Sequence, residues 1–209
     1  TTMLLGAAKY LAETKNFKGK VVLIFQPAEE GYAGAKAMIE DGLFNKYPIE
    51  EIYGMHNMPN LEKGVIAVEQ GARLAAADNF EIEIIGKGAH GAMPSNSVDP
   101  ILCASSVVQN LQQIVSRNSN PIETLVVTVA SFHSGDANNV IPKFAKLTGT
   151  VRYYDKKIGK LARDRIHGII ENTCKAFNAS SQVKYISGYP ATINHSDQSI
   201  FAFEAAKNV

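Results

Sequence analysis

The sequence predicts a mixed α/β protein in which one domain is inserted into another. Up to about Gly71, helical patterns alternate with short apolar runs, which predicts a parallel sheet with helical crossovers. From Ala76 the pattern changes to the order β-α-β-β-α-β, the split arrangement of ferredoxin-like domains. From Gly188 we expect the chain to return to the first domain. The predicted segments are 1–74, 75–187 and 188–209.

The first domain is predicted to begin with a helix over Thr2–Glu13, because apolar residues recur there on one face. The apolar run Val21–Phe25 predicts a strand buried on both faces. Pro27 ends this strand, since proline has no N–H to donate and its φ is fixed. A helix over Gly34–Asp41 and a second short buried strand, Ile52–Gly54, are predicted to follow.

The inserted domain is predicted to begin with a half-buried strand, because Phe80, Ile82 and Ile84 alternate with two glutamates. A helix with an apolar stripe follows from Asp99. The remaining predicted elements are strands at Leu125–Phe132, Ala145–Tyr153 and Val183–Ser187, a helix over about Gly159–Phe177, and a last helix over Ile200–Lys207 in the returning segment.

Composition excludes several classes of function. The 209 residues have 45% hydrophobic content and a formal net charge of +1, so no strong field is expected to attract nucleic acid or an anionic membrane. No apolar stretch is long enough for a membrane span. Cys103 and Cys174 both lie in predicted helices, which favours small core residues in a reducing compartment over a disulfide. We therefore expect a cytoplasmic protein without nucleic-acid or membrane partners.

Polar residues follow both predicted strands of the first domain. Glu29 and Glu30 come after the first, at the strand end where open α/β sheets place their ligands. In extended backbone their side chains point to opposite sides, so one could bind a metal while the other moves protons. Alternatively, both acids simply favour the positive end of the next helix. His56 follows the second strand and completes a Glu and His pair of the kind zinc binds, although a structural histidine is the simpler interpretation and catalytic zinc normally uses three protein ligands.

Five segments, in order along essentially the whole chain, resemble signature segments of the zinc-dependent aminoacylase and carboxypeptidase superfamily. The nearest branch contains hippurate hydrolase, N-acyl-amino-acid amidohydrolases and plant hydrolases of auxin–amino-acid conjugates. The segments are 26–31 (QPAEEG), 54–57 (GMHN), 86–94 (GKGAHGAMP), 139–142 (NVIP) and 149–152 (GTVR). The resemblance implies a partial zinc-peptidase-like catalytic domain with an inserted ferredoxin-like α+β domain that acts as lid and dimerisation domain.

The resemblance implies metal-assisted hydrolysis of the amide bond of N-acyl amino acids. Glu29 would take a proton from the metal-bound water and pass it to the departing nitrogen. Glu30 and His56 would be metal ligands. The implied cofactor is zinc, as one of two divalent ions, with manganese, cobalt or nickel as alternatives.

The resemblance also assigns roles in the inserted domain. His90, between Gly88 and Gly91 on a loop shaped for close approach, would stabilise the oxyanion, either in its own subunit or by reaching in from the partner subunit of a homodimer. Asn139 and Arg152 would hold substrate oxygens, Arg152 by gripping a carboxylate. Taken alone, Asn139 is typical of an Asx turn and Asn138 competes with it for any role, and only the family's NVIP register selects Asn139. An exposed strand arginine usually serves solubility.

The chain also departs from the family. Relatives carry a Cys-Gly-His-Asp-x-His segment just before the position of Thr1 and a further histidine ligand beyond that of Val209, and neither lies in these 209 residues. We therefore expect an internal fragment that is inactive by itself and at most a weak metal binder. The alternative from another class is a non-catalytic binding or dimerisation module. Its sheet would present Val126, Thr128, Thr148 and Thr150 on central strands, which argues against RNA binding through exposed aromatics.

Overall fold

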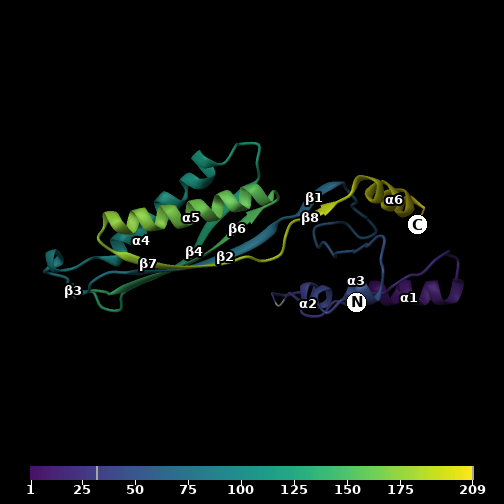
Figure 1. Ribbon diagram of the computed structural model, residues 1–209, viewed down its shortest axis with the longest axis horizontal. Helices are drawn as coiled ribbons and strands as arrows, with labels where there is room; N and C mark the ends of the chain where they lie inside the picture. Colours follow the sequence, from purple (N-terminus) through teal and green to yellow (C-terminus); the bar gives the residue numbers. More distant parts are fainter. Residues whose placement is uncertain (32, 209) are drawn as a thin grey trace. The chain divides into compact units, whose positions relative to one another are not determined.

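The computed structural model describes residues 1–31 and 33–208. The chain divides into two compact units, Thr1–Gly64 and Val65–Val209 (Figure 1). The finer division into 1–74, 75–187 and 188–209 stays a prediction.

The described part of the first unit contains helices and no assigned strand. Its helices are α1 (Thr2–Thr14), α2 (Gly34–Glu40) and α3 (Leu43–Lys46). The predicted helices over Thr2–Glu13 and Gly34–Asp41 are thus confirmed to within one residue at their ends. Gly42 follows α2 with a φ of 88°, a left-handed conformation that suits glycine and starts α3 directly.

The two buried strands predicted for this unit are wrong. Val21–Phe25 is not assigned as strand, and its odd-numbered residues are exposed, with Val21 at 47%. Ile52–Gly54 is likewise unassigned, and Ile52 is 64% exposed. A strand needs a neighbour to pair its N–H and C=O groups, and no other described segment of this unit supplies one. The predicted parallel sheet is therefore absent from the part of the unit that the structure describes.

The second unit is built on a four-stranded antiparallel sheet with strand order β4-β6-β2-β7. Its main elements follow one another as β-α-β-β-α-β, the order that the sequence predicts. They are β2 (Ala76–Ile85), α4 (Pro100–Leu111), β4 (Leu125–His133), β6 (Phe144–Tyr153), α5 (Lys156–Ala176) and β7 (Ser180–Ile186).

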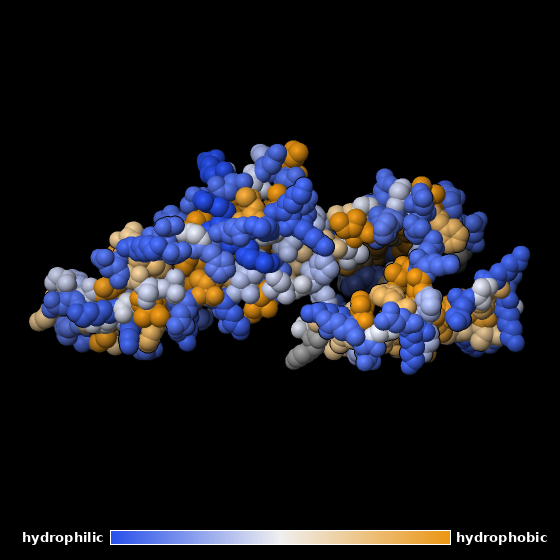
Figure 2. All heavy atoms as spheres, viewed as in Figure 1, coloured by the Kyte–Doolittle hydropathy of each residue, from blue (hydrophilic) through white to orange (hydrophobic). Residues whose placement is uncertain are grey.

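Helices α4 and α5 pack on one face of this sheet (Figure 1). Alternation along β2 turns Phe80, Ile82 and Ile84 towards the helices, where all three are buried. Asp99 caps α4 by accepting a hydrogen bond from the Ile101 N–H at 2.8 Å. The outer surface of α5 is predominantly hydrophilic (Figure 2). The core therefore lies between the helices and a single face of the sheet.

The opposite face of the sheet is polar along the middle of its central strands. The central strands β2 and β6 place Glu81, Glu83, Thr148 and Thr150 there, without exposed aromatic residues at those positions. Strand β4, which carries Val126 and Thr128, lies at the edge of the sheet and not at its centre, so the prediction of a central position is wrong for those two residues. Phe144, at the first position of β6, is 40% exposed, so the absence of exposed aromatics predicted for the central strands holds for the middle of β2 and β6 and not for the end of β6.

Two small sheets complete the second unit. Strand β3 (Ala89–His90) pairs with β5 (Val140–Ile141), and β1 (Gly71–Leu74) pairs with β8 (Thr192–Asn194). A 3-10 turn (Pro94–Asn96), a π-helical turn (Ile114–Asn118) and helix α6 (Ser196–Lys207) are the remaining elements.

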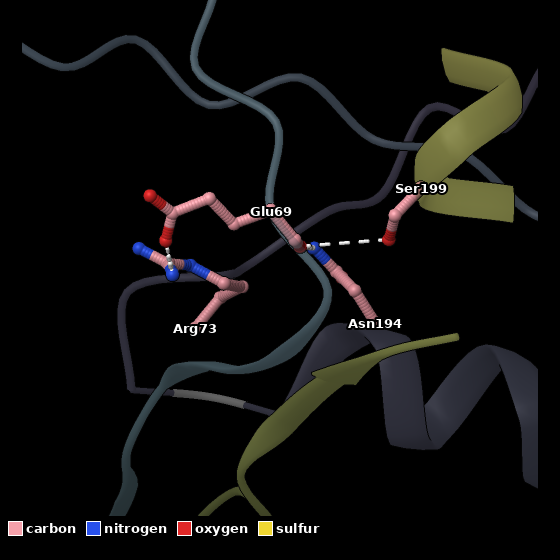
Figure 3. A network of polar contacts seen from close by, with 4 residues as sticks. All are labelled: Glu69, Arg73, Asn194 and Ser199. Carbon is pink, nitrogen blue, oxygen red and sulfur yellow. Dashed lines mark hydrogen bonds and ion pairs between the residues drawn. The ribbon is translucent and has the colours of Figure 1, made fainter. Parts of the chain in front are cut away.

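A polar network secures β8 and α6 to the segment before β1 (Figure 3). The Glu69 carbonyl oxygen accepts hydrogen bonds from the Asn194 amide at 2.9 Å and the Ser199 hydroxyl at 3.5 Å. The carboxylate of Glu69 pairs with Arg73. The returning segment predicted from Gly188 onward thus contacts residues immediately before the inserted elements.

Both cysteines lie in the helices that the sequence predicts for them. Cys103 on α4 and Cys174 on α5 are buried and free, with their sulfur atoms 3.8 Å apart. Burial, followed in size by the neighbouring Cys174, raises the pKa of Cys103 to about 12. In the part of the chain that the structure describes, no helix has the length and apolar character needed to cross a membrane.

Candidate functional site

Glu29 and Glu30 lie in a tight turn before α2, with both side chains exposed to solvent. Ala28 and Gly31 have left-handed φ angles of 49° and 88°, and the Gly31 N–H donates to the Glu29 carbonyl at 2.7 Å. A Cβ at Gly34 would lie 1.7 Å from the Pro27 carbonyl oxygen, so the close return of the chain requires glycine there. The prediction of extended backbone at the two acids is wrong, because both lie in the turn.

His56 is exposed and has one ring nitrogen engaged. Its Nδ1 lies 2.8 Å from the Asn57 carbonyl oxygen. A carbonyl oxygen can only accept, so Nδ1 carries the proton of this bond. In the neutral ring, Nε2 then has a free lone pair, which is the arrangement found in metal-bound histidines.

His90 and Asn139 belong to adjacent backbone segments of the β3–β5 pair. His90 is opposite Val140, and the Gly91 N–H donates to the Asn139 carbonyl at 2.7 Å. A Cβ at Gly91 would lie 3.2 Å from that same carbonyl oxygen, and one at Gly88 would lie 2.9 Å from the Ile141 carbonyl oxygen. The close backbone approach inferred from the two glycines is present.

His90 is the opposite tautomer to His56. The Ala92 N–H donates to His90 Nδ1 at 3.1 Å, so this nitrogen is the acceptor. In the neutral ring the proton is then on Nε2, which can donate a hydrogen bond. One imidazole thus offers a lone pair and the other offers an N–H.

Arg152 is half-buried on the polar face of β6. Its Nη1 lies 3.1 Å from the Val151 carbonyl and 3.4 Å from the Asp78 carbonyl, and it also contacts the Thr150 hydroxyl. These contacts engage one side of the guanidinium through a single nitrogen.

The candidate residues fall into two sets. Glu29, Glu30 and His56 belong to the first unit, whereas His90, Asn139 and Arg152 belong to the second. Among the described residues, no group of three or more His, Cys, Asp or Glu side chains comes together as a metal site. The donor chemistry of Glu30 and His56 fits a divalent ion, but two ligands do not complete a shell.

Sequence reasoning missed Asp78, a carboxylate that is only 1% exposed. It accepts hydrogen bonds from two tyrosines and one backbone N–H. A signal was present in the sequence, because Asp78 shares the alternation of Phe80, Ile82 and Ile84 and so had to face the core.

The chain is similar to proteins of a known family. The profile described as peptidase family M20/M25/M40 matches residues 1–209, the whole chain. This chain belongs to that peptidase family.

Two relatives in this family are similar over 93% or more of this M20-family chain. Hippurate hydrolase of Campylobacter jejuni is 42% identical over 209 residues, which is 100% of this chain and 54% of that protein. N-acetyl-L-cysteine deacetylase of Bacillus subtilis is 42% identical over 93% of this chain and 46% of that protein. The M20 chain thus spans about half the length of the curated relatives it matches.

Solved structures agree with the family assignment. A protein of methicillin-resistant Staphylococcus aureus is 32% identical and superposes with a TM-score of 0.91 over 99% of this chain and 55% of that one. The YXEP protein of Bacillus subtilis, described as a dinuclear metal-binding peptidase of family M20, is 32% identical with a TM-score of 0.78, over 98% of this chain and 51% of its own. The mixed α/β fold of this chain is therefore that of M20 peptidases.

Proposed function

We propose that the full-length protein is a metal-dependent amidohydrolase that cleaves the amide bond of N-acyl amino acids. The observation that carries the proposal is the opposite chemistry of the two histidines. His56 offers a free Nε2 lone pair, as a metal ligand must, and His90 offers an Nε2–H, as an oxyanion donor must. Similarity to hippurate hydrolase and N-acetyl-L-cysteine deacetylase supports the choice of substrate class.

Glu30 and His56 would hold the divalent ion, for which zinc is the first candidate and manganese, cobalt and nickel are the alternatives. A bound ion of this kind supplies a Lewis acid and lowers the pKa of its water. Glu29, exposed beside Glu30, would accept the proton of that water and deliver it to the departing nitrogen. Two ligands fall short of a complete shell, so residues outside this chain would complete the site.

His90, Asn139 and Arg152 would hold the substrate. The Nε2–H of His90 would donate to the oxyanion of the tetrahedral intermediate. Asn139, adjacent to it across the β3–β5 pair, would bind a second substrate oxygen. Arg152 would bind the amino-acid carboxylate through the guanidinium nitrogens that the strand leaves available.

Residues 75–187 would form a ferredoxin-like lid that also builds a homodimer. The strand order β4-β6-β2-β7 supports the ferredoxin-like topology. Strands β4 and β7 are the edges of this sheet, and an edge strand can pair with its symmetry mate. Multi-angle light scattering of the full-length protein should give the mass of a dimer, and a monomer at high concentration would contradict this part.

The test of the function is hydrolysis by the full-length protein of a panel of hippurate, N-acetyl amino acids and indole-acetyl amino acids. Hydrolysis of at least one substrate, lost with a chelator and restored by a divalent ion, is expected. The 209-residue chain by itself should show neither turnover nor stoichiometric metal. A full-length protein that binds no divalent ion and hydrolyses none of the panel would instead favour the binding or dimerisation module.

A further inference from the structure

Asp78 is a carboxylate on the helix-facing side of β2, with only 1% of its surface exposed. Removing a carboxylate from water is costly unless donors replace the lost hydration. The structure supplies three donors. The hydroxyls of Tyr153 and Tyr185 reach Oδ2 at 3.0 Å and 2.8 Å, and the Gly188 N–H reaches Oδ1 at 3.0 Å.

These three donors come from β6, from β7 and from the chain just after β7. The regular pairing of β2 with β7 ends at Asn79 and Ile186, and beyond this point the two segments stay in contact without the regular ladder. Asp78 is the β2 residue next to Asn79, and its side chain accepts a hydrogen bond from the Gly188 N–H. The carboxylate thus holds the chain where it leaves the sheet.

The segment 187–189 is held closely by further contacts. A Cβ at Gly188 would lie 1.9 Å from the Ala77 carbonyl oxygen, and the Ala77 N–H donates to the Tyr189 carbonyl at 3.3 Å. Arg163 of α5 donates to the Ser187 hydroxyl at 2.8 Å. We call residues 187–189 the exit segment.

Two side chains of α5, Arg163 and His167, lie close to the Tyr185 ring. The guanidinium carbon of Arg163 is 4.9 Å from the centre of the Tyr185 ring, and the His167 ring is tilted by 42° to it with the two ring centroids 6.3 Å apart. Burial, and then the hydrogen bond to Asp78, raises the pKa of both Tyr153 and Tyr185. Both hydroxyls therefore remain protonated donors at neutral pH.

The backbone of Asp78 contacts the other face of the sheet. Its carbonyl oxygen accepts from the Thr150 hydroxyl at 3.0 Å and from Arg152 Nη1 at 3.4 Å. One residue thus contacts the exit segment with its side chain and Arg152 with its main chain.

We propose that Asp78 is a positioning residue that couples the exit segment to Arg152, so that the carboxylate sets where the guanidinium meets the substrate. This rests on the proposed carboxylate-binding role of Arg152. The part that concerns Asp78 and the exit segment stands on the hydrogen bonds alone.

The test is Asp78→Asn in the full-length protein, which keeps the size of the side chain and removes its charge. The Gly188 amide should exchange with solvent about 10- to 100-fold faster, the range of one hydrogen bond to a charged group. The Arg152 Nε–H resonance should shift, and KM for an N-acyl amino acid should rise more than kcat falls. The matched control is Asp164→Asn, because Asp164 is an exposed carboxylate on α5. This variant should change neither the Gly188 exchange rate, nor the Arg152 resonance, nor KM.

Tyr185→Phe is the second variant, for use if Asp78→Asn does not fold. It removes one donor without altering the carboxylate, and we expect smaller changes of the same sign. Unchanged exchange at Gly188 would overturn the proposal. Faster exchange without any shift at Arg152 would overturn the coupling. If the unaltered protein hydrolyses no N-acyl amino acid, the proposed function fails, and the Gly188 and Arg152 resonances still decide the role of Asp78.

Discussion

Gly149, at the centre of β6, is expected to tolerate no side chain. A Cβ there would lie 2.1 Å from Phe80 Cζ and 2.3 Å from the Thr128 carbonyl oxygen. The Phe80 ring can turn, but the Thr128 carbonyl belongs to the neighbouring strand and moves only with its backbone. Gly149→Ala therefore forces β4 and β6 apart by about 1 Å, or moves Phe80 out of the core.

The cost follows from these contacts. Overpacking of a core costs about 1–3 kcal/mol in the free energy of unfolding. We expect about 3 kcal/mol for Gly149→Ala, because the added Cβ meets a backbone carbonyl on one side and a buried ring on the other. For a domain of this size that lowers the unfolding midpoint by roughly 6–12 °C. The assay is urea and thermal unfolding followed by circular dichroism.

Gly168→Ala on α5 is the matched control, because nothing lies within 4 Å of its added Cβ. It should stabilise the helix by about 0.5–1 kcal/mol. Adding Phe80→Leu to Gly149→Ala should recover only part of the loss, since the Thr128 carbonyl remains. A Gly149→Ala protein as stable as the parent would refute this packing of β4, β6 and Phe80.

Three further predictions concern the second unit. Gly88→Ala in the full-length protein should lower kcat/KM more than stability, because its Cβ would lie 2.9 Å from the Ile141 carbonyl and displace His90; unchanged kinetics would count against the β3–β5 site. Cys103, with its pKa raised to about 12, should resist a thiol reagent at pH 8 in the folded chain and react in urea, so rapid labelling of folded protein would contradict its burial. Tyr185 has a raised pKa when folded, so its stabilising effect should be complete below about pH 10 and lost as the pH rises further, and Tyr185→Phe should flatten that loss in unfolding titrations.

The inserted elements could be predicted from sequence because their patterns are decided locally. Phe80, Ile82 and Ile84 alternate with charged residues, and strand pairing inside the same unit satisfies that alternation. The run Val21–Phe25 has an equally strong pattern but no pairing neighbour among the described residues. Hydrophobicity predicts which residues favour burial, whereas a strand forms only where a second segment of the chain pairs with its backbone N–H and C=O groups.

The site was predictable in its residue types and not in its geometry. A glycine on each side of His90 indicated a close backbone approach, and the Gly91–Asn139 hydrogen bond confirms it. The ring nitrogen that each histidine engages depends on backbone groups of Asn57 and Ala92, which no residue pattern fixes. Strand alternation could have revealed Asp78, but its three donors come from residues 75 to 110 positions away.

The central claim, a metal-dependent hydrolase with distinct roles for adjacent glutamates, is tested most directly by metal content and turnover of Glu29→Gln and Glu30→Gln in the full-length protein. Glu29→Gln should keep its divalent ion and lose turnover by about 100- to 10,000-fold, the usual contribution of a general base. Glu30→Gln should lose both metal and turnover, because it removes a ligand. Loss of metal in Glu29→Gln alone would reverse the two roles. Full metal content and full turnover in both variants would contradict the account.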